Sequence, residues 1–393
     1  MALSKSERCH GRCLHSTHYK SMKSVRYKNS MVFLLGRFGF GGVERVTVDL
    51  ANALCLNGWR IGIAFFEEEP DSCLSALKEG INIIRLKFPV NGGSNVKKLR
   101  AYVDESNVDF IMNQWALPIK VTHFIRKVCK GRSIIKVSMI HTMPSLNNRI
   151  RMSKGLMKLF WVLLSRISLR LVYQLNDAFV LLSDSYKEEF ERFTFLKNSK
   201  KLFTLPNPVR MMDVQSQKKE DLIIFVGRLS AEKRVDRIID VWRKAYERLP
   251  GWKVEIVGDG TEREKLEEYS KGLPRFSFVG YQSPDDYYKR AKLILLTSDF
   301  EGFGLVLVEA MSAGCVPVVF GNYSAAYEIV TDSVGVTVSP PWKEERFEDE
   351  LVFLANDKER FSKLSIAGSI AAKRYSIDNV VINYKEFLRK LKK

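Results

Sequence analysis

The chain has 393 residues, which exceeds the usual size of a single domain and predicts two domains of comparable size. Hydrophobic residues make up 46% and charged residues 27%, values typical of a soluble globular protein with buried cores. The formal net charge is +18: residues 1–210 carry 34 Lys and Arg against 16 Asp and Glu, whereas residues 211–393 carry 29 of each. We therefore expect a first domain that faces an anionic surface and a second domain that binds small molecules.

The sequence also excludes disulfide-rich and membrane-spanning classes of protein. The six cysteines are scattered, and several lie in apolar segments, so we expect reduced thiols in a cytosolic protein. No apolar run reaches the roughly 18–20 residues of a membrane-spanning helix. The most hydrophobic stretch, 156–175, is interrupted by Lys158, Arg166 and Arg170. No secretory signal is expected, because residues 1–30 lack an apolar core.

Residues 1–30 contain seven Lys and Arg and one Glu, and we expect them to form a disordered basic extension. Met22 and Met31 are alternative starts of the functional chain. A zinc finger needs a second ligand pair across a loop, and no such pair follows, so we predict no metal site here. The residues of this segment that could suggest a zinc site are Cys9, His10, Cys13, His15 and His18.

From residue 31 onward, short apolar runs typical of strands alternate with longer segments typical of helices. In the first half we expect strands at 31–35, 61–66, 81–86, 110–112, 134–140 and 178–182. The helices expected between them include 43–57, 120–130 and 184–193. Continuously apolar strands separated by helices predict a parallel sheet that is covered on both faces.

The same alternation restarts in the second half and predicts a second doubly wound α/β unit. Its expected strands and helices are 222–226, 253–257, 276–279, 293–296 and 316–319, with 232–248, 262–271 and 347–355. Pro206-Asn207-Pro208 and the polar stretch 213–220 mark the boundary, which gives domains of 31–210 and 211–377. Residues 378–393 are expected to form an amphipathic helix. Ligands of such sheets bind beyond the carboxyl ends of the strands, so both domains can face one cleft.

Two carboxylates flank a glycine-containing turn that follows the expected strand 293–296. Gly302 and Gly304 let backbone N–H groups approach an anion, and the apolar helix 305–311 adds the positive end of its dipole. Glu301 is expected above the strand end, and Glu309 one to two turns into the helix. Carboxylates are poor phosphate ligands but good acceptors for sugar or ribose hydroxyls. The alternative is that Glu301 is a loop charge and Glu309 an ordinary, partly exposed helix carboxylate.

Basic residues and glycines follow other strands at the same edge. Arg228 follows the first strand of the second domain, and Lys233 begins the next helix, so both cations can neutralise a bound diphosphate. In the first domain, Gly41 and Gly42 lie in a turn between a strand and a helix, where a phosphate can approach. The third glycine of the dinucleotide-binding fingerprint is absent. Each feature alone also occurs at ordinary helix starts.

Together these motifs resemble those of the retaining family-four glycosyltransferases, whose fold is GT-B, with two facing Rossmann-like domains. The resemblance covers about residue 31 to the C-terminus and is most specific in the second half. It is looser from about 87 to 201, where acceptor binding varies in the family. The motifs that carry it are Gly41-Gly42-Val43-Glu44-Arg45, Pro206-Asn207-Pro208, Val226-Gly227-Arg228-Leu229 with Glu232-Lys233, Val257-Gly258-Asp259-Gly260, and Glu301 with Glu309.

The resemblance implies a role for each matching residue. Arg228 and Lys233 would bind the donor diphosphate, Glu309 the ribose, and Glu301 the sugar. His141, at the end of the strand 134–140, matches the family histidine that contacts the transferred sugar, although a histidine at a strand end is more often structural or exposed. Glu301 and His141 are thus the expected catalytic residues, and the final helix is expected to cross back onto the first domain. Further donor contacts are expected at Gly302, Phe303, Gly304, Gly41, Gly42, Gly258 and Val279.

The implied activity is transfer of a sugar, with retention, from a nucleoside-diphosphate sugar to a hydroxyl acceptor. Departure of the diphosphate builds negative charge, which Arg228, Lys233 and the helix N-terminus are placed to stabilise. No DxD motif is present to hold a divalent ion between phosphates, so we expect metal-independent transfer without a cofactor. The sugar, the base, the acceptor, the linkage and the oligomeric state are not determined by the sequence.

The basic first domain suggests a further partner. A basic helix with aromatic and aliphatic residues suits the surface of an anionic membrane, whereas the alternative is a core helix with a charged outer face. The excess positive charge favours the membrane, and with it a lipid-linked or other cell-surface glycan precursor as acceptor and a position on the cytoplasmic face. The basic residues around the apolar stretch 156–164 are Arg149, Arg151, Lys154, Lys158, Arg166 and Arg170.

Two other classes of protein are alternatives to a transferase. A nucleotide-sugar epimerase of the same architecture binds a donor without transferring it, and incubation with donor alone would reveal it. Arg228, Lys233 and the paired glutamates favour the transferase. A basic nucleic-acid-binding protein rests only on charge, because no recognised RNA- or DNA-binding module is present and the neutral second half would have no role. We therefore expect no nucleic-acid partner.

Overall fold

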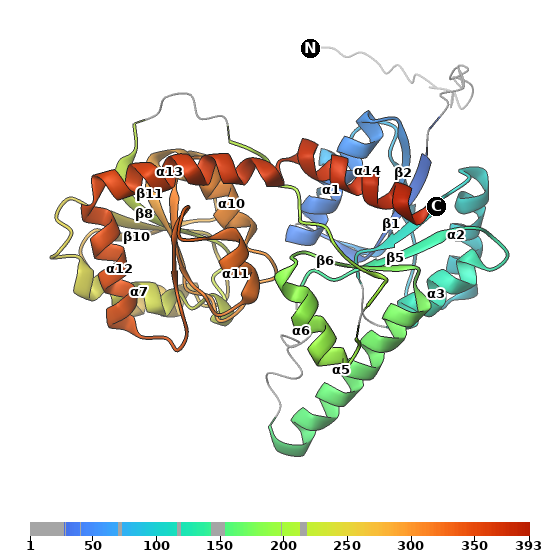
Figure 1. Ribbon diagram of the computed structural model, residues 1–393, viewed down its shortest axis with the longest axis horizontal. Coiled ribbons are helices and arrows are strands. Elements are labelled where there is room, and N and C mark those ends of the chain that lie inside the picture. Colours follow the sequence, from blue (N-terminus) through green and yellow to red (C-terminus); the bar gives the residue numbers. More distant parts are fainter. Residues whose placement is uncertain are drawn as a thin grey trace, which may run out of the picture.

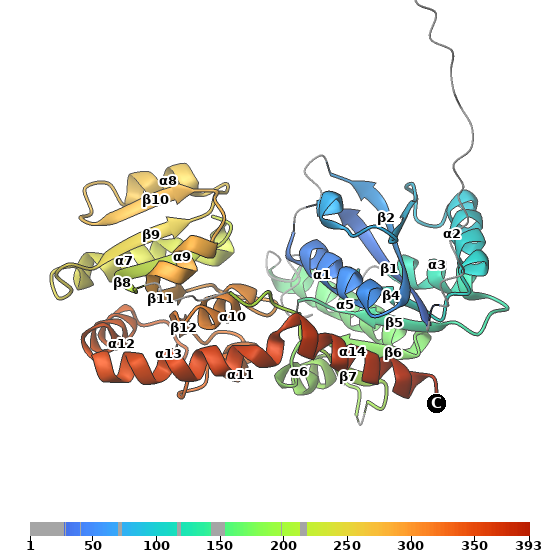
Figure 2. The ribbon, with the colours of Figure 1, turned by 90° about the horizontal axis from the view of Figure 1, so that it is seen from above.

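The computed structural model describes residues 27, 29–39, 41–69, 73–115, 119–142, 154–197, 199–212 and 218–393. Two parallel sheets lie side by side along the long axis of the molecule, each with helices around it (Figure 1). Turning the molecule shows the two α/β bodies as separate masses, with the final helices running along both (Figure 2). The predicted fold class, GT-B-like α/β with two Rossmann-like domains, is confirmed.

The first sheet has seven parallel strands in the order β3-β2-β1-β4-β5-β6-β7. Its strands are β1 (Asn29–Phe38), β2 (Trp59–Glu68), β3 (Asn82–Arg85), β4 (Phe110–Asn113), β5 (Ile135–Met139), β6 (Ala178–Leu181) and β7 (Leu202–Thr204). Helices cover both faces: Val32 of β1 packs in one core with α2 and α3, and Phe33 packs in another with α1. The helices are α1 (Gly42–Leu56), η1 (Cys73–Ala76), α2 (Gly93–Glu105), α3 (Ile119–Cys129), α5 (Gly155–Leu175) and α6 (Ser185–Thr194).

The second sheet has six parallel strands in the order β10-β9-β8-β11-β12-β13. The strands are β8 (Glu220–Val226), β9 (Lys253–Val257), β10 (Phe276–Gly280), β11 (Ala291–Leu296), β12 (Val316–Phe320) and β13 (Val336–Val338). The order reverses between β8 and β11, which makes a topological switch point at their carboxyl ends. The helical elements are η3 (Ala231–Lys233), α7 (Val235–Ala245), α8 (Arg263–Tyr269), α9 (Asp285–Arg290), α10 (Leu305–Ser312), α11 (Ser324–Ile329), α12 (Glu344–Asn356), α13 (Lys358–Ala372) and η4 (Lys373–Tyr375).

The chain returns to the first domain through its last helix, α14 (Ile377–Leu391). This helix lies against α1 (Figure 1), and its fully buried Tyr384 places its hydroxyl 3.4 Å from the sulfur of Met139 in β5. Lys392, just beyond the helix, forms an ion pair of 2.7 Å with Asp109. Where the chain crosses back, Val209 donates a backbone hydrogen bond of 2.8 Å to Tyr375. The chain therefore passes between the two domains twice, once near Val209 and once near Tyr375.

Most predicted strands are confirmed, and the differences have local causes. The strands β7 and β13 were missed because each has only three residues. The single helix predicted over 232–248 is wrong: η3 ends at Lys233, Arg234 takes a left-handed conformation with φ of 51°, and α7 starts at Val235. The predicted extension 1–30 also runs two residues too far, because Asn29 and Ser30 belong to β1 and Ser30 donates its N–H to Asp109.

Some predictions fall outside the described residues, namely those on Cys9 to His18, Arg149 and Arg151. Among the residues that are described, Cys55, Cys73, Cys129 and Cys315 are free thiols. In the same part of the chain, no helix combines the length and the apolar character that crossing a membrane requires.

Candidate active site

The two domains meet where the carboxyl ends of their strands face each other. Tyr186 of α6 places its hydroxyl 3.4 Å from the backbone oxygen of Glu301, which belongs to the other domain. Nearby, the backbone N–H of Ser185 donates to Glu328 of α11 at 3.3 Å, and the Ser183 hydroxyl donates to the same carboxylate. These contacts set the loop after β11 against the first domain.

Glu301 lies in that loop, as predicted, and is only 9% exposed. Lys233 donates from Nζ to both carboxylate oxygens, at 2.7 and 2.8 Å, and Ser298 donates its hydroxyl to Oε1 at 2.7 Å. A buried carboxylate needs such partners because desolvation of an unpaired charge costs several kcal/mol. The alternative of an ordinary loop charge is therefore wrong, since Glu301 is held in one orientation by three hydrogen bonds.

Glu309 is also buried, on the fifth residue of α10, with 4% of its surface exposed. Tyr288 donates its hydroxyl to Oε2 at 2.8 Å, and Arg45 of α1 in the other domain pairs with Oε1. The alternative of a partly exposed helix carboxylate is therefore wrong. Because both oxygens already have donors, a ligand hydroxyl at Glu309 would join or displace Arg45, whose side chain is about half exposed.

His141 follows β5 and faces the same junction. Its Nε2 lies 2.7 Å from Oε1 of Gln114, which can only accept, so Nε2 carries the proton and Nδ1 carries a lone pair. That Nδ1 is buried and has no hydrogen-bond partner among the described residues. Burial lowers the pKa of His141 to about 4, so the ring is neutral near pH 7. The side chain therefore offers one unused acceptor, while the residue as a whole stays partly exposed.

Gly302 and Gly258 stand where backbone segments approach closely. A Cβ atom on Gly302 would lie within 3.0 Å of the backbone oxygen of His141, and one on Gly258 would meet the backbone oxygen of Gly227. Gly304 begins α10 in a left-handed conformation, with φ of 85°, which favours glycine. These glycines allow the loops at the strand ends to pack against each other.

Gly41 and Gly42 begin α1 opposite the start of α10. A Cβ on Gly42 would lie 3.8 Å from Leu305, the first residue of α10, so the two helix N-termini are near neighbours. Gly41 precedes the helix in extended conformation, and Glu44 of the first turn is close to it. Burial raises the pKa of Glu44. The glycine turn thus faces the second domain, as a shared ligand cleft requires.

The other residues predicted to bind the sugar donor differ in which of their groups are accessible to a ligand. Arg228 is exposed after β8, and its side chain makes no hydrogen bond or ion pair with any described residue. Val279 is partly exposed, but its backbone oxygen accepts from Gln282 at 3.1 Å. Phe303 is 3% exposed and packs edge-on against Tyr375 at 5.4 Å, so only its backbone is available to a ligand.

Sequence reasoning missed four residues of this site: Arg45, Gln114, Tyr288 and Ser298. Arg45 belongs to the motif 41–45, and Ser298 lies in the turn that precedes Glu301, so their positions were a usable signal. Gln114 and Tyr288 carried no such signal. Gln114 lies in the connection between β4 and α3, Tyr288 lies in α9, and both reach the site only through the fold.

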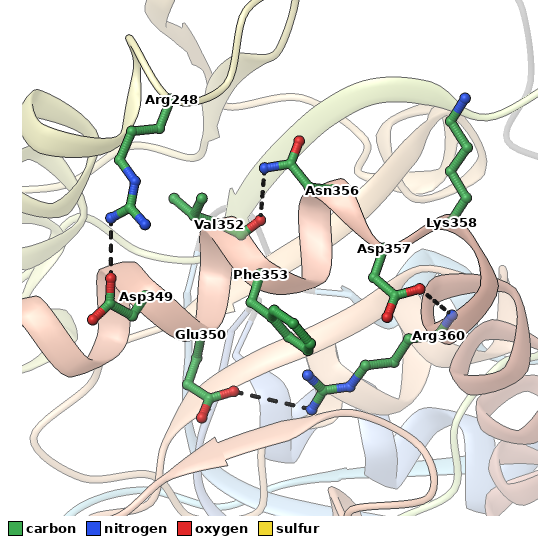
Figure 3. Close-up of a pocket in the computed structure, with 9 residues that line it drawn as sticks. All are labelled: Arg248, Asp349, Glu350, Val352, Phe353, Asn356, Asp357, Lys358 and Arg360. Atoms are coloured by element: carbon green, nitrogen blue, oxygen red, sulfur yellow. Dashed lines mark hydrogen bonds and ion pairs between the residues drawn. The ribbon is translucent and has the colours of Figure 1, made fainter.

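A hollow lined by α12, α13 and the end of the α7 segment lies apart from this site (Figure 3). Most of its charges are paired internally: Arg248 pairs with Asp349 at 3.0 Å, and Arg360 with Glu350 at 4.0 Å. Asp357 accepts from the backbone N–H of Arg360 as a helix cap. Among the described residues, Lys358 is the one charged side chain of this hollow that makes no hydrogen bond or ion pair, so the hollow carries little uncompensated charge.

Two family models match the chain almost end to end. Residues 40–211 match the model described as Glycosyltransferase Family 4, and residues 210–369 match the model described as Glycosyl transferases group 1. The junction of the two matches falls between β7 and β8, where the two sheets separate.

Relatives and solved structures agree with these matches. An uncharacterized glycosyltransferase of Haemophilus influenzae is 23% identical over 376 residues, which are 91% of this chain and 98% of that protein. The Campylobacter jejuni GalNAc-alpha-(1->4)-GalNAc-alpha-(1->3)-diNAcBac-PP-undecaprenol alpha-1,4-N-acetyl-D-galactosaminyltransferase is 25% identical over 77% of this chain and 82% of its own length. The Anabaena protein Alr3699/HepE, solved with UDP and glucose, superimposes with a TM-score of 0.73 at 18% identity, covering 92% of this chain and 100% of that one. The chain therefore belongs to the family-four glycosyltransferases of GT-B fold, and it is a glycosyltransferase.

Proposed function

We propose that the enzyme transfers a sugar, with retention of its anomeric configuration, from a nucleoside-diphosphate sugar to a hydroxyl of a glycan precursor. The observation that carries this proposal is the arrangement around Glu301. Lys233 and Ser298 hold its carboxylate at the switch point of the second sheet, and the His141 loop of the first domain packs on Gly302. The complex of Alr3699/HepE with UDP-glucose, in a protein of the same fold, supports the donor class.

The contacts suggest a division of labour in donor binding. Arg228 is exposed and makes no hydrogen bond or ion pair with any described residue, so it is the side chain best placed to meet a diphosphate. Lys233 would share its charge between Glu301 and the phosphates. Glu309 would accept from the ribose hydroxyls, and Glu301 from those of the sugar. The neutral ring of His141 would accept a hydrogen bond at Nδ1 from a hydroxyl of the transferred sugar.

The proposed reaction breaks the bond between the anomeric carbon and the diphosphate oxygen and forms a bond to the acceptor oxygen on the same face. Arg228, Lys233 and the start of α10 would stabilise the charge that develops on the departing diphosphate. Because these groups supply positive charge themselves, we propose that transfer needs no divalent ion. The described residues offer no group of three or more metal-binding side chains.

The acceptor is proposed to be lipid-linked or part of a cell-surface glycan, with the enzyme bound to the cytoplasmic face of the membrane. The Campylobacter relative acts on an undecaprenol-linked glycan, and other relatives are named for poly(glycerol-phosphate) glucosylation and amylovoran synthesis.

The helix α5 supports membrane attachment. Its N-terminal part projects away from the sheet (Figure 1), and only Ser165, Leu169 and Val172 are buried. The alternative of a core helix with a charged outer face is therefore wrong for this part. Arg166 and Arg170 instead donate to backbone oxygens of Phe193 and Thr194 at the end of α6. Large exposed apolar patches mark interaction sites. The exposed apolar residues are Leu156, Met157, Leu159, Phe160, Leu163, Leu164, Ile167 and Leu171.

The test begins with a panel of nucleoside diphosphates in thermal-shift measurements, because a ligand that binds only the folded state raises the melting temperature. The matching nucleotide sugar is then incubated with and without acceptor, in EDTA, and the anomer of the product is assigned by NMR. We expect a product of retained configuration only when acceptor is present. An inverted product would disprove retention, activity restored only by manganese would disprove metal independence, and conversion of donor alone would indicate an epimerase.

A further inference from the structure

The exposed face of α3 is entirely basic or neutral. Lys120, Arg126, Lys127 and Lys130, which follows the helix, are all exposed, as is His123, and the other residues between them are buried in the core of the first domain. Lys130 follows Lys127 by three residues and Arg126 by four, which places these three side chains on one face. Like charges at this spacing repel one another by a few tenths of a kcal/mol for each pair. The face therefore costs stability unless an anion offsets it.

This face lines an open hollow of about 940 Å³ between α3 and the C-terminal end of α5. Across the hollow lie Lys136, Asp177 and Lys201, which stand at the amino ends of β5, β6 and β7. The donor cleft lies at the opposite, carboxyl ends of the strands. Six Lys and Arg line the hollow against a single Asp, so its local charge is strongly positive.

The charges of the hollow are not neutralised from within. Lys136 pairs with Asp177 at 2.7 Å, and Lys201 donates to the backbone oxygens of Gln174 and Asn176 at the end of α5. These contacts use up the acidic residue and the carbonyl groups. Within the described parts of the chain, the side chains of Lys127 and Lys130 and the two other cations of α3 make no hydrogen bond or ion pair.

The hollow of Figure 3 provides an internal comparison. There Arg248 forms ion pairs with both Glu348 and Asp349, at 2.7 and 3.0 Å, so this basic side chain is already neutralised by acidic side chains of the protein. The hollow at α3 has the same open form, but its one acidic residue, Asp177, pairs with Lys136, and none is left for the cations of α3 within the described chain. A hollow with balanced charge is an ordinary surface, whereas one with a large excess of cations attracts a polyanion.

We propose that the hollow between α3 and α5 is a second anion-binding site, which takes a phosphate group away from the donor cleft. Several lysines and one arginine on a single face suit a group of high charge density such as a phosphate ester, because each ammonium is a compact point charge. The phosphate can belong to a soluble molecule or to the headgroup of an anionic phospholipid. The chemistry is the same for both, and the experiment separates them.

The experiment compares the wild-type chain with two double variants that lose the same charge. The test variant is Lys127→Gln with Lys130→Gln. The control is Lys97→Gln with Lys98→Gln, two exposed lysines of α2 that do not line the hollow. Binding of pyrophosphate is measured by calorimetry, and binding to vesicles of phosphatidylglycerol, with phosphatidylcholine as reference, is measured by co-sedimentation. Anions held by the donor cleft bind equally to all three proteins, so their contribution cancels, whether or not the proposed donor is correct.

We expect the test variant to lose roughly ten- to thirtyfold in affinity relative to the control, which corresponds to two basic contacts. Loss in the pyrophosphate arm identifies a site for soluble phosphates. Loss confined to phosphatidylglycerol vesicles identifies a lipid headgroup. Equal binding by the test and control variants in both arms overturns the proposal. The melting temperatures of the variants establish that a loss of binding does not arise from unfolding.

Discussion

The backbone oxygen of His141 packs directly on the α-carbon of Gly302, so that the loop after β5 and the loop after β11 touch where Gly302 has no side chain. Any side chain at residue 302 must push the domains apart, because the obstacle is backbone.

Gly302→Ala is therefore expected to reduce kcat/KM for transfer by about 10²-fold, since small misplacements of reacting groups cost that much. The melting temperature should change little, because each domain keeps its own core. Gly93→Ala, at the start of α2, is the control: a Cβ there meets nothing within 4 Å. Full activity of Gly302→Ala would show that the His141 contact is dispensable.

Glu301→Gln tests the charge of the carboxylate at nearly constant shape. The amide keeps one acceptor for Lys233 and Ser298 but loses the negative charge and the second acceptor. We expect transfer to fall by about 10²–10³-fold while thermal shifts with the matching nucleoside diphosphate persist. Glu264→Gln, on the exposed side of α8, serves as the control. Transfer at the wild-type rate would remove Glu301 from the mechanism.

Tyr288→Phe removes the hydroxyl that holds Oε2 of Glu309. Because Tyr288 is fully buried, the carboxylate oxygen loses a donor that water does not replace. We expect the free energy of unfolding to drop by about 2 kcal/mol and the KM for donor to rise. Urea denaturation and donor titration measure both effects. The exposed Tyr327 supplies the control, Tyr327→Phe. An unchanged KM in a destabilised Tyr288→Phe would limit this tyrosine to a structural role.

The buried neutral ring of His141 predicts a pH dependence of stability. Burial lowers its pKa to about 4, against about 6.5 in the unfolded chain, so between these values the unfolded state binds more protons. Stability should therefore fall as the pH drops from 6.5 towards 4, by up to about 3 kcal/mol. Urea midpoints at pH 7, 6 and 5 measure the slope, and His141→Gln should flatten it. An identical slope in that variant would assign the effect to other groups.

Exposed apolar residues of α5 predict membrane binding that is separate from folding. Phe160→Ser with Leu163→Ser should reduce binding to phosphatidylglycerol vesicles by about 10²-fold or more, because each buried side chain contributes about 1.5–3 kcal/mol. Both residues are more than half exposed, so the melting temperature should not fall. Leu56→Ser, at the exposed end of α1, is the control for a lost surface leucine. Unchanged vesicle binding by the double variant would exclude α5 as the attachment site.

Several strands and helices of the fold could be predicted from the local pattern of apolar residues. Strands such as β1 and β11 are buried on both faces, so they appear in the sequence as runs of consecutive apolar residues. The helices between them show the usual helical spacing of apolar residues. Strands of three residues, such as β7 and β13, have no such pattern. The break at Arg234 was also invisible, because its left-handed conformation depends on its partners, Asp236 and Asp299.

For the active site, the sequence alone determined that Glu301, Glu309, Arg228 and Lys233 stand near strand ends, because a strand-to-helix turn places its residues at one edge of a parallel sheet. Only the tertiary structure decided which charges meet. The pairing of Arg45 with Glu309 joins residues 264 apart in the chain, and the exposure of α5 depends on how far the helix projects beyond its domain. Such relations depend on the packing of whole elements, which no local spacing encodes.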